Sequence, residues 1–118
     1  MSVRRVVPNV QTESPQDGAE FYAVLGLAEV MDLGWIRTLA APGNPTAQVG
    51  LMREDLTAPV VPDLSIEVDD VDAAYAAMRD RGAEIVHPLT DEDWGVRRFF
   101  VRDPDGRVVN VLRHLRHG

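Results

Sequence analysis

The chain has 118 residues, of which 45% are hydrophobic, and a formal net charge of −7 at pH 7. This length fits one ordinary domain or two very small modules with a shared core, and the hydrophobic content excludes a disordered chain. The absence of cysteine excludes disulfides and thiolate metal sites, and the absence of lysine excludes a Schiff base. The acidic balance argues against nucleic acid as the main partner.

The sequence indicates neither a membrane protein nor a secreted one. No apolar run approaches the roughly 18 residues that a membrane span requires. The N-terminus, Met1-Ser2-Val3-Arg4-Arg5, lacks the apolar core of a signal peptide. We therefore expect a cytoplasmic protein that does not bind membranes.

The charges are unevenly distributed along the chain. Residues 54–93 contain 2 arginines and 12 acidic residues, whereas residues 94–118 contain 6 arginines and 2 acidic residues. One interpretation is a solvated acidic helix followed by a basic pair of strands. The other is an acidic cleft suited to a cationic ligand. The sequence leaves both open.

The predicted elements follow one another in the same order twice. A strand over residues 3–10 precedes a helix that Ser14 can cap and that Gly26 ends, and a strand over 63–68 precedes a helix between Asp70 and Gly82. Three further strands follow each helix, over 26–30, 35–40 and 46–53 in the first half and 82–86, 97–102 and 107–113 in the second. The order predicts a single α+β domain, residues 1–118, built of two βαβββ modules. The modules cover residues 1–57 and 60–118, with a linker over 55–62.

Alternation along the strands separates an apolar face from a mixed one. The apolar positions of the first strand are Val6, Pro8 and Val10, which we expect in the core. The opposite, mixed face carries the polar residues Asn9, Gln48, Asp63, Ser65, Glu67 and Asn110. Such a face suits either a solvent-exposed sheet surface or a concave pocket with a few orienting polar groups.

Three motifs resemble the vicinal oxygen chelate superfamily, which includes glyoxalase I, bleomycin-resistance proteins and extradiol dioxygenases. They are the strand–helix stretch over residues 63–75, the hairpin from Trp94-Gly95 to Asp103-Pro104-Asp105-Gly106, and the pair Phe21-Tyr22 with Leu25-Gly26. The resemblance implies paired βαβββ modules with mixed sheets that curl around a cleft. It also implies a homodimer.

The resemblance further implies where metal-dependent members carry their ligands, near Val7, Gly50, Asp63 and Asn110. Valine and glycine side chains cannot bind a metal, and an amide oxygen is a weak ligand for zinc, nickel or iron. A shift of the first strand by two residues substitutes Asn9, which is little better. We therefore expect no metal and no other cofactor. The alternative is a divalent metal at an atypical site through Asp63, Glu67 or His87.

Several other side chains allow two interpretations each. Glu67 is either a general base with a pKa raised by burial or a carboxylate paired with an arginine, for which Arg98 is a candidate. We interpret His87 as a loop or rim residue, and His114 and His117 as part of a C-terminal tail. Trp35 and Trp94 either stack on a flat ligand or belong to the core or a dimer interface.

These observations favour a metal-independent protein that binds a small molecule and sequesters an aromatic or cationic compound such as an antibiotic. The predicted ligand-binding residues are Asn9, Trp35, Gln48, Asp63, Ser65, Glu67, Trp94, Arg98 and Asn110, and we assign no catalytic residue. The alternative is a lyase, isomerase or dioxygenase for a small carbonyl or aromatic substrate, with an atypical metal site or Glu67 as general base. A third possibility is a module whose mixed face binds a protein.

Overall fold

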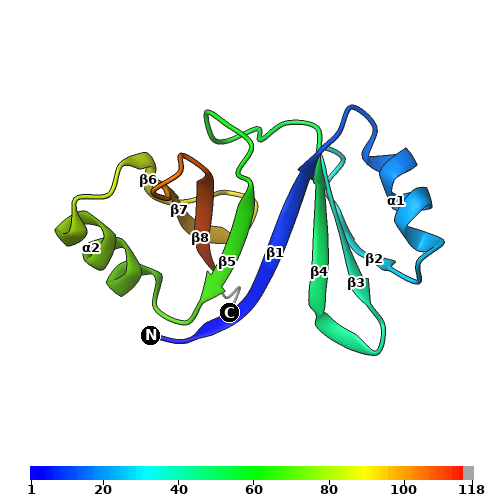
Figure 1. The fold of residues 1–118 in the computed structure, drawn as a ribbon, viewed down its shortest axis with the longest axis horizontal. Helices are drawn as coiled ribbons and strands as arrows, with labels where there is room; N and C mark the ends of the chain where they lie inside the picture. The colour runs from blue at the N-terminus through cyan, green and yellow to red at the C-terminus, as the bar shows by residue number, and fades with distance from the viewer. Residues whose placement is uncertain (116–118) are drawn as a thin grey trace. The chain divides into compact units, whose positions relative to one another are not determined.

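The computed structural model describes residues 1–115, and within them it contains two helices and eight strands. The elements in chain order are β1 (Val3–Gln11), α1 (Pro15–Ala23), β2 (Ala28–Asp32), β3 (Ile36–Ala41), β4 (Asn44–Met52), β5 (Leu64–Val68), α2 (Val71–Arg81), β6 (Ile85–Asp91), β7 (Val96–Arg102) and β8 (Val108–His114). This is the predicted βαβββ order, repeated once (Figure 1). The predicted strand ends lie within three residues of the observed ones, except that β6 continues to Asp91, five residues beyond its predicted end.

The helix caps read from the sequence are present. The Ser14 hydroxyl accepts a hydrogen bond from the Asp17 amide, and the Asp70 carboxylate accepts one from the Ala73 amide. Gly82 ends α2 in the left-handed conformation, with φ of 81°. Helix α1 ends earlier than expected, at Ala23, so that Gly26 lies in the turn that follows the helix.

The chain divides into two compact units. The first comprises residues 6–61, and the second comprises residues 1–5 together with the chain from Pro62 onward. We call them the first and second modules. In the first, the strand order is β2-β3-β4-β1, with β1 parallel to β4 and the other pairs antiparallel. Gly18 of α1 lies directly against the Leu51 side chain of β4.

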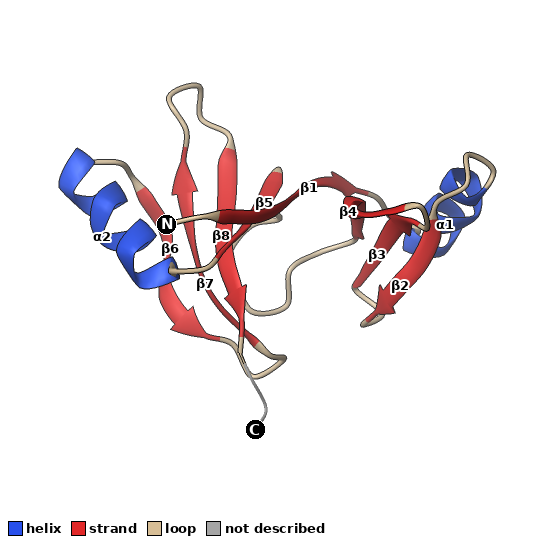
Figure 2. Cartoon of the chain, turned by 90° about the horizontal axis from the view of Figure 1, so that it is seen from below, coloured by secondary structure: helices blue, strands red, loops and turns tan. Residues whose placement is uncertain are grey.

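The second module has the order β5-β8-β7-β6, with β5 parallel to β8 (Figure 2). One face of this sheet packs on α2 and forms a compact core. The core consists of Val68, Val71, Ala74, Phe99, Val101 and Val111, with Tyr75 and Met78 at its edge. Ile66 of β5 and Val109 of β8 are partly buried and pack against this core.

The first strand differs from the prediction. Val7, expected on the mixed face, is 6% exposed, whereas Val6 and Val10, expected in the core, are 46% and 38% exposed. Pro8 is exposed as well. Alternation in sequence identifies two faces, but it cannot say which one is covered when both carry apolar residues.

The fold class is confirmed as α+β, with mixed sheets and one helix for each set of four strands. None of the helices formed by residues 1–115 is long and apolar enough to cross a membrane.

Candidate functional site

The candidate site is the face of the second module's sheet that points away from α2. The register places Ser65 beside Asn110, Phe100 opposite Asn110, and Arg98 opposite Leu112. Phe100 is 0% exposed, Arg98 1% and Asn110 6%. A plain solvent-facing surface, one of the two interpretations of the mixed face, is therefore wrong for β7 and β8.

Asn110 has an incomplete set of hydrogen bonds. Its Nδ2 donates to Ser65 Oγ over 3.1 Å, and its Oδ1 is buried without a hydrogen-bond partner among the described residues. Exchanging the amide oxygen and nitrogen would only move the deficit to the nitrogen. An unsatisfied buried polar atom costs about 1–3 kcal/mol, so this amide favours a ligand or water that supplies the missing partner.

A buried arginine lies next along this face. The Arg98 guanidinium lies between two aromatic rings, 4.9 Å from the centroid of Trp94 and 4.8 Å from that of Phe100. Its Nε is 3.7 Å from Glu92 Oε1, and the same oxygen lies 2.9 Å from His87 Nε2. This cluster brings together the predicted residues Trp94 and Arg98, and it includes His87, whose side chain is 12% exposed. The interpretation of His87 as a loop or rim residue is wrong, because it lies within β6.

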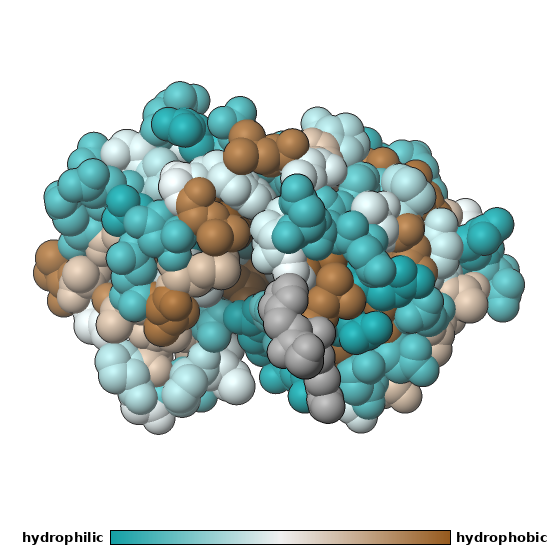
Figure 3. Space-filling view, turned by 180° about the vertical axis from the view of Figure 1, so that it is seen from behind, coloured by the Kyte–Doolittle hydropathy of each residue, from teal (hydrophilic) through white to brown (hydrophobic). Residues whose placement is uncertain are grey.

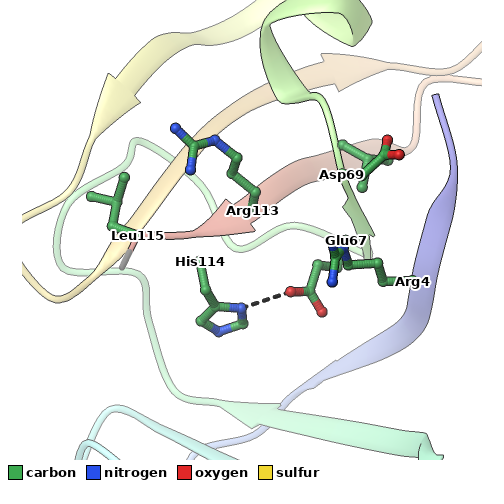
Figure 4. Close-up of a pocket in the computed structure, with 7 residues that line it drawn as sticks. Arg4, Glu67, Asp69, Arg113, His114 and Leu115 are labelled. Atoms are coloured by element: carbon green, nitrogen blue, oxygen red, sulfur yellow. Dashed lines mark hydrogen bonds and ion pairs between the residues drawn. The ribbon is translucent and has the colours of Figure 1, made fainter. Parts of the chain in front are cut away.

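A second cluster joins three strands at the ends of β5 and β8. Arg5 Nε donates to Glu67 Oε1 over 2.7 Å, and His114 Nδ1 lies 2.8 Å from Glu67 Oε2 (Figure 4). When the neutral ring carries its proton on Nδ1, Nε2 can accept from Arg5 Nη2 at 3.5 Å. The three side chains then form a closed ring of hydrogen bonds.

This ring of hydrogen bonds lowers the pKa of the Glu67 carboxyl. Partial burial alone would raise the pKa of the carboxyl, but the hydrogen bond from His114 and the charge of Arg5 outweigh it and hold the pKa below its ordinary value of 4.5. The condition for a general base, a pKa raised by burial, is therefore not met. The expectation of an arginine-paired carboxylate is confirmed, but the partner is Arg5 rather than Arg98.

The sequence did not single out Arg5, and it placed His114 in a tail. His114 is instead the last residue of β8 and a partner of Glu67. The strand pattern that runs regularly to Arg113 could have indicated this position. If the alternation is continued by one residue, His114 points to the same face of the sheet as Glu67. His117 lies outside the described residues.

Two of the positions where the resemblance implies metal ligands, Asp63 and Asn110, lie in the second module. Asp63 Oδ2 accepts a hydrogen bond from the Val108 amide over 2.8 Å, and Asn110 offers only an amide. The alternative metal site proposed from the sequence used Asp63, Glu67 and His87 as ligands. Each of these side chains has a different hydrogen-bond partner. Within residues 1–115, no group of three or more histidine and acidic side chains could hold a metal ion.

Three predicted site residues belong to the first module. Asn9 pairs with Gly50 across β1 and β4, and a Cβ added at Gly50 would collide with Asn9 Oδ1. Gln48 shares that face of β4 and donates to the Pro45 carbonyl over 2.9 Å. Trp35, 8% exposed, precedes β3. Whether these three residues contact a ligand stays a prediction.

The chain belongs to the Glyoxalase/Bleomycin resistance protein/Dioxygenase superfamily, whose family model matches residues 6–111. No curated protein matches the sequence. Among solved structures, similar chains include one described as the NAD-dependent benzaldehyde dehydrogenase from Legionella pneumophila, with a TM-score of 0.76 and 20% identity, covering 92% of this chain and 98% of that one.

Two further solved structures have the same fold. Methylmalonyl-CoA epimerase from Mycobacterium tuberculosis gives a TM-score of 0.66 at 22% identity, covering 97% of this chain and 88% of that one. A superfamily member from Vibrio splendidus 12B01 gives 0.64 at 17% identity, covering 95% and 99%. Identities this low establish a shared fold and no shared activity.

Proposed function

We propose that this superfamily member binds a small molecule without a catalytic metal, and that its ligand is an aromatic or cationic compound, such as an antibiotic, that it sequesters. The observation that carries the proposal is the buried Asn110 Oδ1, which lacks a donor. An N–H or ammonium group on the ligand would supply that donor.

The surroundings of Asn110 support such a ligand. Phe100, directly opposite on β7, supplies apolar surroundings for the amide, and Ser65 Oγ accepts a hydrogen bond from the amide nitrogen. A few fixed polar groups among aromatic side chains are typical of ligand sites. The lowered pKa of Glu67 makes the carboxylate a weak base, which disfavours the acid–base alternative.

Calorimetric titration tests this function. Chelator-treated protein is titrated with a panel of cationic and aromatic compounds, antibiotics among them. We expect saturable binding of at least one compound, weakened by Asn110→Ala and unchanged by Gln16→Ala on the exposed face of α1. Turnover of a panel compound that stops when the metal is removed would contradict the proposal.

We further propose that the protein acts as a homodimer. Phe21 near the end of α1 and Val24 and Leu25 directly after it are apolar, and they are 66%, 85% and 74% exposed. Hydrophobic residues also reach the surface at several other places (Figure 3). Light scattering should give twice the mass of the chain, and Leu25→Glu should shift it toward the monomer. A monomeric wild type would contradict this.

A further inference from the structure

A hollow opens in the second module where β5 and β8 end. Its volume is about 240 Å³, and its lining includes Arg4, Glu67, Asp69, Arg113 and His114. The two strands are paired as far as Glu67 and Leu112, and the hollow lies among the residues that follow them. Drug-sized ligands occupy pockets of roughly 300–1,000 Å³, so this hollow suits a smaller group.

Both acidic side chains of the hollow already have partners. Glu67 is held by Arg5 and His114. Asp69 Oδ1 accepts a hydrogen bond from the Ser2 amide over 2.7 Å, which holds the pKa of Asp69 below its ordinary value. Neither carboxylate therefore needs an added cation.

The two arginines are not held in this way, although the charge of Arg113 acts on the Asp72 carboxyl and helps to lower its pKa. Neither Arg4 nor Arg113 forms an ion pair with any residue of the described range 1–115. Arg113 also stands directly opposite Arg97 on β7, whose guanidinium is held by Asp72 and Asp91, each over 2.8 Å. Like charges opposite each other on neighbouring strands are unfavourable, so Arg113 gains from a nearby anion.

Both arginines line the hollow. Arg4 and Arg5 are consecutive on β1, as are Arg113 and His114 on β8, and consecutive side chains point to opposite faces. Arg5 and His114 contact Glu67, so Arg4 and Arg113 each point to the opposite face of their own strand, and both line the hollow. In Figure 4, Arg113 points away from the Glu67–His114 pair.

We propose that this hollow binds a small oxyanion, the carboxylate or phosphate group of a ligand, between Arg4 and Arg113. Guanidinium groups bind such anions through paired, charge-assisted hydrogen bonds. The site is independent of the ligand proposed at Asn110, because Asn110 does not line the hollow.

Nuclear magnetic resonance titration tests this site. Isotope-labelled protein is titrated separately with inorganic phosphate and with acetate, at ionic strength held constant with chloride. We expect saturable shifts of the amides around Arg4, Asp69 and Arg113 with at least one of the anions, and the tighter one identifies the group. Arg113→Gln and Arg4→Gln should each weaken binding about tenfold, as expected for loss of a charge-assisted contact.

Arg107→Gln is the matched control, because Arg107 is an exposed arginine that pairs with Asp103 and Asp105 in the turn before β8. It should leave the affinity unchanged. Amide spectra away from the hollow verify the fold of each variant, and Arg4→Gln carries the test if Arg113→Gln fails to fold. The proposal is overturned if neither anion saturates, or if Arg107→Gln weakens binding as much as Arg113→Gln.

Discussion

Glu67 and His114 are 47 positions apart in sequence, yet His114 Nδ1 lies 2.8 Å from Glu67 Oε2. With Arg5, the pair ties together β1, β5 and β8 at one end of the sheet. The ring holds the pKa of Glu67 below its ordinary value, which makes the carboxylate a weaker base.

Glu67→Gln should lower stability in a pH-dependent way. The folded-state pKa of Glu67 is below the ordinary 4.5, so the carboxylate stabilises the fold above that pH and loses its contribution as the pH falls through the folded-state value. We expect a loss of about 1–2 kcal/mol near neutral pH, typical of hydrogen bonds to a charged group. Urea unfolding at several pH values measures it. Glu20→Gln, an exposed control on α1, should change little, and a pH-independent loss for Glu67→Gln would contradict the account.

Arg98→Lys should destabilise the second module by about 1–2 kcal/mol, because an ammonium cannot lie flat between Trp94 and Phe100 as a guanidinium does. Thermal unfolding and tryptophan fluorescence measure the effect. The matched change Arg102→Lys alters an exposed arginine that pairs with Glu84, and it should be near neutral. Equal effects of the two substitutions would show that the aromatic stacking does not matter.

Gly50→Ala tests the close approach of β1 and β4. The added Cβ would collide with Asn9 Oδ1, so we expect a loss of about 1–3 kcal/mol or a displaced Asn9 side chain. Gly43→Ala is the control, since a Cβ there meets nothing within 4 Å. The stabilities of the two variants are compared through their midpoints of denaturant unfolding. A neutral Gly50→Ala with Asn9 unmoved would contradict the geometry.

Metal removal should leave the protein unchanged. The polar groups of the second module's face hydrogen-bond to one another and to the backbone rather than converge as a ligand set. We therefore expect the same melting temperature before and after treatment with a chelator, and well under one divalent metal per chain by elemental analysis. A metal bound in equal number to the chain, and a lower melting temperature after its removal, would contradict this expectation.

The repeat and the helix caps could be predicted because they rest on local chemistry. Ser14 and Asp70 cap helices through atoms three residues away, and Gly82 supplies a conformation that other residues avoid. The polar face of β5 and β8 followed from alternation alone, and it placed Ser65 and Asn110 together as observed.

The partners of the charged residues could not be predicted in the same way. Glu67 pairs with Arg5 rather than Arg98 because the start of β1 lies with the second module, which no local pattern indicates. His114 continues β8 because it pairs with Val96 of β7, a contact distant in sequence. The covered side of β1 likewise depends on tertiary packing, since Val6, Val7 and Val10 are all apolar.

The central claim is that a ligand supplies the hydrogen-bond donor that Asn110 Oδ1 lacks. The substitution Asn110→Leu tests this claim most directly. This substitution removes the buried unsatisfied atom at similar volume, so we expect stability equal to or above that of the wild type. Calorimetric titration with a compound that binds the wild type should then give an affinity at least about tenfold lower, the loss expected for one such hydrogen bond. An Asn110→Leu variant that binds the compound as tightly as the wild type would contradict the account.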